Sequence, residues 1–298
     1  MKSLVATLAL AVLSCAQAAA HPGWGIVVDS KGNVFYTDLK QVWKIEPSGK
    51  KSVAVADVHT HELRLDAQDN LYGEHLWYQA EGEKWWHRVW KLAPDGKLTE
   101  VVATRELKAA DFSGQVRDFS FVADRAGNVF WVRDQVTVMR RATDGTITAI
   151  AGGSASAPGS MSSNEGFTRL DRMAIGPDGA LYLLDGGRLC RVAADGAVTT
   201  LARGLDERSV SMFEVSPQHR LMGLGVDAEG NVYVANYSAR QVKKVGTDGK
   251  VTVFLRAHLP WSPTGVAVSD AIVYVLEYTV RSARVRKVPP NGPVVTLP

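Results

Sequence analysis

The sequence predicts an all-β protein, a six-bladed β-propeller whose blades are four-stranded antiparallel sheets. Two repeated turns predict it. A hairpin turn with a central glycine recurs about every fifty residues, at Gly49, Gly96, Gly145, Gly196, Gly249 and Gly292. A second turn follows a short apolar strand in each interval, as in DSKGNVFYTD (29–38) and DAEGNVYVAN (227–236). Glycine suits such turns because tight connections between twisted strands require positive φ.

Each repeat therefore contains four strands, which we call A to D. In the first repeat they are GIVVD, VFYTD, QVWKIE and KSVAVA. One such sheet has two apolar faces and cannot bury them alone, whereas six sheets in a ring bury each face against a neighbour. The chain opens with a strand A and ends with PVVTLP as a strand D. We expect no strand exchange between the first and last blades, so that face packing alone closes the ring.

Composition assigns the chain to the ordinary globular class. It has 298 residues, of which 46% are hydrophobic and 22% charged, and a formal net charge of +3. This balance gives no electrostatic reason to expect a nucleic-acid partner. Residues 1–20, MKSLVATLALAVLSCAQAAA, are expected to be a secretory signal peptide, and residues 21–298 a single propeller domain. The protein is then periplasmic or secreted, with no transmembrane segment; lipid anchoring at Cys15 is the less favoured alternative, because Leu13 stands where a smaller residue is usual.

The repeats resemble a known family. GIVVDSKGNVFYTD, and LGVDAEGNVYVAN followed by RQVKKVGTDGKVTVF, are similar to NHL repeats. The resemblance covers essentially all of residues 21–298 and places the chain in the broad neighbourhood of the gluconolactonase (senescence marker protein) and streptogramin-lyase propellers. It implies the fold strongly and the function weakly, since propellers of this kind serve as scaffolds, lyases and lactonases alike.

The histidines of the sequence fall on or near one face of the expected ring. This top face holds the start of each strand A and the end of each strand B. Ligands bind at propeller mouths because the loops there vary on a rigid frame. The histidines are His21, His59, His61, His75, His87, His219 and His258.

The second repeat carries the richest set of candidate ligands. His59 and His61 lie two residues apart on one strand, and Glu74 and His75 return beside them. Three imidazoles and a carboxylate can hold zinc or a similar divalent ion, calcium or magnesium included. Strand alternation limits the set: if His61 faces the channel, Glu62 points into the blade interface, and only one of Glu74 and His75 points inward. A hydrogen-bonded histidine cluster without a metal remains the alternative.

Aligned repeats predict a ring of residues at the channel mouth. The position before the glycine of GIVVD is occupied in turn by Trp24, His61, Phe119, Asp171, Met222 and Thr264. In the families named above, this region supplies metal or catalytic residues, so the resemblance implies metal ligation by His61 and Asp171, with Asp118 as a substitute if its strand carries a bulge. The lactonase pattern needs a Glu where Trp24 stands. Trp24, Phe119 and Met222 instead indicate an apolar substrate-binding rim.

The connection between strands B and C of the second repeat is predicted to be a long aromatic loop. LWYQAEGEKWWHRVW (76–90) contains Trp77, Trp85 and Trp86. These side chains either pack the loop on its own blade or stack against a planar substrate such as a sugar ring.

The sequence favours a metal-assisted hydrolase or lyase that acts on a small molecule at the channel mouth. His61 and Asp171 are the expected metal ligands, helped by His59 or Asp118, with His75 or Glu74 as proton shuttle. No organic cofactor is expected, because no dinucleotide or phosphate-loop motif is present. The alternative is a non-catalytic propeller that binds a ligand or a protein partner.

Overall fold

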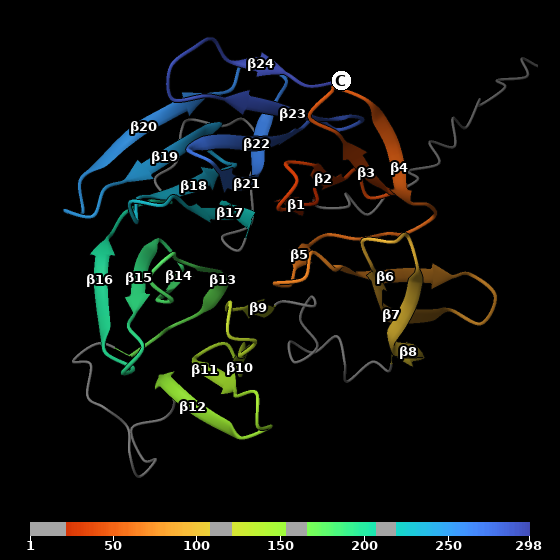
Figure 1. Ribbon diagram of the computed structural model, residues 1–298, viewed down its shortest axis with the longest axis horizontal. Helices are drawn as coiled ribbons and strands as arrows, with labels where there is room; N and C mark the ends of the chain where they lie inside the picture. Colours follow the sequence, from red (N-terminus) through yellow and green to blue (C-terminus); the bar gives the residue numbers. More distant parts are fainter. Residues whose placement is uncertain (1–21, 108–120, 153–165, 207–218) are drawn as a thin grey trace, which may run out of the picture.

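The predicted six-bladed propeller is confirmed by the structure, a computed structural model that describes residues 22–107, 121–152, 166–206 and 219–298. Twenty-four strands form six four-stranded antiparallel sheets, and no α-helix occurs in the described residues. The sheets are arranged in a ring with the first strand of each at the centre (Figure 1). The predicted leader 1–20, Cys15, Asp118 and Phe119 lie outside the described residues.

Each blade consists of four consecutive strands. The first three blades contain β1 (Ile26–Val28), β2 (Val34–Thr37), β3 (Val42–Ile45) and β4 (Lys51–Val55); β5 (Leu63–Leu65), β6 (Leu71–Gln79), β7 (Lys84–Leu92) and β8 (Leu98–Leu107); and β9 (Phe121–Ala123), β10 (Val129–Arg133), β11 (Thr137–Arg141) and β12 (Ile147–Gly152). The last three contain β13 (Leu170–Ile175), β14 (Leu181–Asp185), β15 (Arg188–Val192) and β16 (Val198–Ala202); β17 (Leu221–Val226), β18 (Val232–Asn236), β19 (Gln241–Val245) and β20 (Val251–Arg256); and β21 (Ser262–Ser269), β22 (Ile272–Tyr278), β23 (Ala283–Val288) and β24 (Val295–Thr296).

The repeated Asp and Asn of the A-to-B turns form a side-chain hydrogen-bond network. In blade 1, Asp29 accepts hydrogen bonds from the backbone N–H groups of Lys31 and Asn33, at 3.0 and 2.7 Å, and from the Asn33 side chain at 2.6 Å. The sixth blade makes the turn without glycine, because Asp270 and Ala271 both adopt positive φ, 49° and 63°. The recurring polar residues of these turns are therefore structural.

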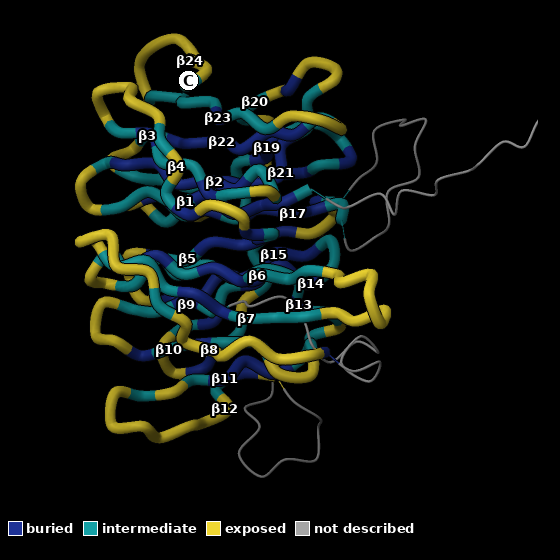
Figure 2. The backbone as a smooth tube through the Cα atoms, turned by 90° about the vertical axis from the view of Figure 1, so that its right-hand side faces the viewer, coloured by how far each residue is buried: buried dark blue, intermediate teal, exposed yellow. Residues whose placement is uncertain are grey.

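The ring closes by face packing, as expected. Among the described strands, no sheet mixes strands from the first and last blades. Ile26, Val34 and Tyr36 of blade 1 instead form one buried cluster with Leu276 and Tyr278 of blade 6. The Tyr278 hydroxyl also donates to the Thr37 carbonyl at 2.5 Å. Buried strands fill the middle of the molecule, and the exposed residues gather largely in the turns (Figure 2).

Glycines let the innermost strands approach each other on one side of the ring. A Cβ on Gly265 would lie 2.4 Å from the Trp24 carbonyl oxygen, and one on Gly223 would lie 2.6 Å from the Gly265 Cα. A Cβ on Gly25 would lie 2.8 Å from the Leu63 nitrogen. Blades 5, 6, 1 and 2 therefore meet backbone to backbone around the channel.

The prediction of a long aromatic loop in blade 2 is wrong. β6 and β7 continue as paired strands to residues 79 and 84, so that only a short turn joins them. Trp77 pairs with Trp86 and Tyr78 with Trp85. Such aromatic cross-strand pairs stabilise the two strands beyond the point at which the charged residues and the glycine of the sequence suggest a loop. His75 and His87 thus lie within strands rather than at loop ends. In Figure 1 this is the long orange hairpin on the right.

The described residues contain no helix that is long and apolar enough to span a membrane.

The close approach at Gly265 makes a test of ring closure. We expect Gly265→Ala to destabilise the fold by about 1–3 kcal/mol or more, because the added methyl group overlaps a backbone carbonyl of blade 1. Urea unfolding of the purified variant measures the change. The matched control is Gly166→Ala, where a Cβ would meet no atom of the described residues within 4 Å. Equal stability of the two variants would contradict this account.

Candidate functional site

The candidate site begins where the innermost strands of blades 1 and 2 enter the channel. The backbone N–H groups of Trp24 and Gly25 both donate to the His61 carbonyl, at 2.9 and 2.8 Å. The Trp24 ring stacks on the His61 imidazole with centroids 5.7 Å apart and planes 23° apart. These contacts fix His61 at the channel mouth, where it is 3% exposed.

Glu74 is a buried carboxylate held between two imidazoles. Its Oε1 lies 3.3 Å from Nδ1 of His61, and its Oε2 lies 3.5 Å from Nε2 of His87. Its backbone carbonyl accepts hydrogen bonds from the Trp90 indole at 2.9 Å and from the Thr60 hydroxyl. Burial alone would raise the pKa of Glu74, but the hydrogen bonds from His61 and His87 outweigh it and lower the pKa to about 2. The carboxylate is therefore ionised at neutral pH.

Two further histidines flank this unit without joining it. His59 packs edge-on against His61 at 4.7 Å, and its Nδ1 lies 3.0 Å from the Leu39 carbonyl. Burial, together with the neighbouring His61, lowers the pKa of His59. Neighbouring residues of a strand point to opposite faces, so His75 lies on the other face of β6 from Glu74. It packs against Trp77 at 4.4 Å, and burial, with Arg88 and His59, lowers its pKa to about 4.

Asp171 from blade 4 and His219 from blade 5 are also near the channel mouth. Asp171 is held by Arg169, whose Nε lies 3.0 Å from both carboxylate oxygens. Burial and then the charge of Arg172 lower the pKa of His219, and Asp171 and His61 both act on it electrostatically. The His219 ring is therefore within electrostatic range of candidate residues from blades 2 and 4.

The described donors do not fit a metal ion. No three His, Cys, Asp or Glu side chains in the described part of the chain are arranged to hold one. Asp171 is engaged by a guanidinium, Glu74 by two imidazoles, and His59 by a backbone carbonyl. Asp118, the remaining expected ligand, lies outside the described residues. The geometry of the described residues therefore does not support the predicted metal site.

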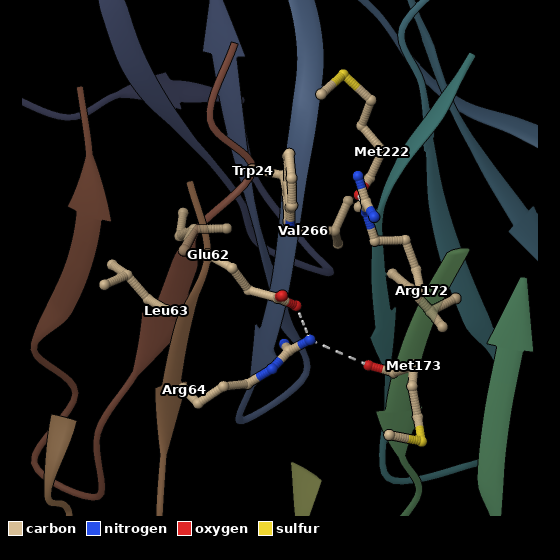
Figure 3. A pocket seen from close by; sticks show the side chains of 11 residues that line it. Trp24, Glu62, Leu63, Arg64, Arg172, Met173, Met222 and Val266 are labelled. Atoms are coloured by element: carbon tan, nitrogen blue, oxygen red, sulfur yellow. Dashed lines mark hydrogen bonds and ion pairs between the residues drawn. The ribbon is translucent and has the colours of Figure 1, made fainter. Parts of the chain in front are cut away.

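A cavity with about 300 Å³ of empty space, including the part open to solvent, lies in the channel. Trp24 and Met222, both expected at the rim, line it (Figure 3). The guanidinium of Arg172 lies 3.7 Å from the centre of the Trp24 ring and donates through Nε to the Met222 carbonyl at 2.8 Å. A side chain of blade 4 thereby reaches blades 1 and 5. The other lining residues are Ile26, Glu62, Leu63, Arg64, Met173, Gly223, Leu224 and Val266.

The charged cavity residues were missed by the sequence reasoning. Glu62, expected in the blade interface, lines the cavity and is paired with Arg64. In blade 2 the condition that His61 faces the cavity is not met, because Glu62 and Arg64, two residues apart on one side of the chain, line it instead. In blade 4 a bulge between Leu170 and Arg172 re-aims the side chains that follow. The aligned repeats nevertheless contain a signal for these residues. At the position where blades 1, 5 and 6 have Gly25, Gly223 and Gly265, blades 2 and 4 have Glu62 and Arg172.

The aromatic hairpin presents two pairs of rings. Trp77 and Trp86 stack with centroids 6.3 Å apart, and Tyr78 and Trp85 meet at 5.2 Å on the other face. Tyr78 and Trp85 are 49% and 38% exposed. The rings therefore pack on each other and still offer open aromatic surface on this hairpin.

Comparison with solved structures confirms the six-bladed propeller fold. No protein-family model and no curated protein matches the chain. Among solved structures, virginiamycin B lyase from Staphylococcus aureus has a TM-score of 0.52 at 13% identity, covering 94% of this chain and 85% of that one. A gluconolactonase from Xanthomonas campestris has a TM-score of 0.52 at 15% identity, with 86% and 83% covered. A Bacteroides thetaiotaomicron protein of unknown function has a TM-score of 0.57 at 14% identity, with 93% and 74% covered. Such identities show the shared six-bladed fold alone.

The lowered pKa of His75 makes folding sensitive to acid. The unfolded chain takes up this proton below about pH 6.5, whereas the folded protein does so only near pH 4, so stability is lost as the pH falls between these values. Between pH 7 and 4, we expect the free energy of unfolding of His75→Gln to fall by about 1–2 kcal/mol less than that of the wild-type protein, after allowance for solvent screening. Urea unfolding between pH 7 and 4 measures it. His258→Gln, at an exposed histidine, should keep the wild-type slope; a wild-type slope in His75→Gln would refute the assignment.

Proposed function

We propose that the protein is a lyase or hydrolase that acts on a small organic or sugar-derived substrate at the channel mouth. His61 is the group that moves the proton, and Glu74 orients it. The observation that carries the proposal is the buried Glu74 carboxylate with His61 and His87 on its two oxygens. Placing an ionised carboxylate in a protein interior is costly, and a stable core does not require it. Such perturbed groups beside a cleft are characteristic of functional sites.

Glu74 determines which atom of His61 can do chemistry. Because Nδ1 of His61 lies against the carboxylate, Nε2 is the atom that exchanges a proton with a substrate. The negative charge of Glu74 also stabilises the imidazolium that forms when Nε2 accepts a proton. We assign this role to His61 rather than His75, because His75 lies on the face of β6 opposite Glu74.

Two reactions suit this arrangement. In a lyase, Nε2 of His61 takes a proton from carbon, the C–H electron pair forms a double bond, and the leaving group departs from the adjacent carbon. In a hydrolase, Nε2 takes a proton from water as the oxygen attacks a carbonyl, and returns it to the leaving group.

The similar structures suggest the first substrates to test. One is a lyase of virginiamycin B and another a gluconolactonase, and both share this fold. We therefore propose streptogramin B and gluconolactone as assay compounds.

A second candidate function is ligand binding without turnover. The exposed rings of Tyr78 and Trp85 favour it, since an open aromatic hairpin can hold a planar or apolar ligand, or a protein partner, with no chemistry.

We expect Glu74→Gln to lower kcat by about 10²–10⁴-fold, because the amide no longer stabilises the His61 imidazolium. His61→Gln should lower it similarly, and the double variant should lose little more than either single variant, since the two residues act as one unit. Steady-state rates on the two assay compounds measure this. Glu81→Gln, an exposed carboxylate on the same hairpin, is the matched control.

Heavy-oxygen water separates the reactions, because a hydrolase incorporates its oxygen into product and a lyase leaves a double bond. Full activity of Glu74→Gln would refute the catalytic role. Saturable binding of an assay compound without turnover would favour the binding function instead.

We also propose that the protein works outside the cytoplasm. Residues 1–20 support this, with their Lys2, apolar run and small residues at the end. We expect secreted or periplasmic protein to begin near His21, which sequencing of its N-terminus would check. Cytoplasmic protein retaining Met1 would contradict the proposal, and a lipid-modified N-terminus at Cys15 would favour anchoring.

A further inference from the structure

The two most exposed large hydrophobic side chains of the described residues lie at the same end of blade 6. Val280 is 101% exposed and Leu259 is 74% exposed, whereas the next in order, Ile147, is 57% exposed. Val280 belongs to the turn between β22 and β23, and Leu259 to the connection from β20 to β21. The pairing of Ser262 with Tyr278 places these two segments side by side, at the end of the ring where the first strand of each blade begins.

Hydrogen bonds hold both side chains at the tips of tight turns. The Trp261 N–H donates to the carbonyl three residues earlier at 3.0 Å, which encloses Leu259 in a four-residue turn. The Thr279 N–H donates to the Ser282 carbonyl at 2.9 Å, and the Thr279 hydroxyl accepts from the Ser282 N–H at 3.0 Å. The two turns therefore present Leu259 and Val280 to solvent in fixed positions.

Folding does not account for the apolar character of these tips. The turn equivalent to the Val280 turn is Gly186–Gly187 in blade 4, and in blade 5 it contains Ser238 and Ala239. A side chain that stays exposed in the folded protein buries no apolar area and contributes no hydrophobic stabilisation. One exposed hydrophobic residue is ordinary on a protein surface, but two on adjacent turns indicate contact with another apolar body.

The same two segments carry positive charge. The sequence reads RAHLPWS from Arg256 onward and TVRSAR up to Arg284, with no Asp or Glu in either. Arg256 and Arg281 are exposed, and neither forms an ion pair with a described residue. Arg284 is held by the buried Glu277 through Nε at 2.7 Å, and its guanidinium lies 4.1 Å from the centre of the Trp261 ring. Two exposed cations and a tryptophan therefore border the apolar tips.

This combination fits an acidic membrane surface better than a protein partner. A protein interface of ordinary size buries about 800 Å² on each partner around a contiguous apolar core. Blade 6 offers instead two single apolar side chains. A lipid surface accepts such side chains one by one, because the acyl chains rearrange around them while neighbouring cations stay among acidic headgroups. Tryptophan is likewise enriched at the boundary between lipid and water.

We propose that the blade 6 tip, defined as residues 256–261 and 279–284, docks reversibly on membranes that carry acidic lipids. Leu259 and Val280 enter the edge of the acyl layer, while the neighbouring exposed arginines bind lipid phosphates. The binding is weak, because even a whole myristoyl chain gives only marginal membrane attachment. The channel mouth is at the same end of the ring, so docking brings it close to the lipid. The proposal does not depend on the proposed catalysis.

Sedimentation with vesicles tests the docking. One set of vesicles is phosphatidylcholine alone, and the other contains about one third phosphatidylglycerol. We expect binding to the acidic vesicles that decreases as salt is added. Leu259→Ser and Val280→Ser should each weaken it several-fold, and Arg281→Gln should weaken it by about fivefold on the acidic vesicles only.

The matched controls lie beside turns at the opposite end of the ring. Ile147→Ser removes an exposed apolar side chain there, and Arg125→Gln removes an exposed positive charge, so both should bind like the wild-type protein. Each variant is measured in the full chain and in the chain from His21, which contains all the described strands, so that any contribution of the predicted leader is separated. Urea unfolding checks that stability is unchanged, as expected for exposed positions.

Val280→Trp provides a test in the direction of tighter binding. Tryptophan prefers the membrane interface, so we expect this variant to bind several-fold more tightly than the wild-type protein. Brominated lipids should also quench the fluorescence of the added indole, because it lies among the acyl chains. Ile147→Trp should neither tighten binding nor be quenched.

The proposal is overturned if the wild-type protein does not bind acidic vesicles, if Ile147→Ser weakens binding as much as Val280→Ser, or if Val280→Trp leaves it unchanged. Self-association without lipid binding, abolished by Val280→Ser in sedimentation velocity, would also overturn it and assign the tip to a second copy of this chain. Each of these results leaves the role of Glu74 unaffected, because the kinetic variants test that separately.

Discussion

The packing of each blade face against the next is the constraint on which the rest of this structure depends. In the described part of the chain no strand is shared between blades 1 and 6, so the ring closes mainly because apolar faces such as Ile26, Tyr36 and Leu276 bury one another. That packing pulls the innermost strands together until their backbones touch. Glycine is then required at Gly25, Gly223 and Gly265, where any side chain would meet a neighbouring strand.

The same constraint explains why the polar groups of the channel lie where they do. Blades 5, 6 and 1 leave no room for side chains at their glycine positions, so the polar side chains of the channel come from blades 2 and 4. Arg172 enters from blade 4 and extends as far as Trp24. Glu62 and Arg64 enter from blade 2 as an ion pair. A buried charge needs partners. Glu62 and Arg64 find each other within blade 2, whereas Arg172 reaches Trp24 and the Met222 carbonyl across the channel.

Much of the architecture could be predicted from the sequence, because turn chemistry is local. A glycine or an Asp–Asn pair makes the A-to-B turn in five blades, and a glycine recurs in the C-to-D turn of all six, so the period predicts six sheets. The site residues depend on non-local geometry. Neither the bulge beside Asp171, which re-aims Arg172, nor the cross-strand pairing of Trp77 with Trp86 follows from the local pattern. His61 could be predicted from its position before a strand, but its contact with Glu74 depends on the register of β6.

The arrangement around Trp24 brings groups of opposite charge together from three blades. One side of the site is a fixed negative charge, Glu74, which lies against Nδ1 of the His61 ring. The other is the positive Arg172, which lies against the same indole that His61 stacks on. Because His61 comes from blade 2, Trp24 from blade 1 and Arg172 from blade 4, the packing of blade faces that forms the ring also sets the distance between the two charges.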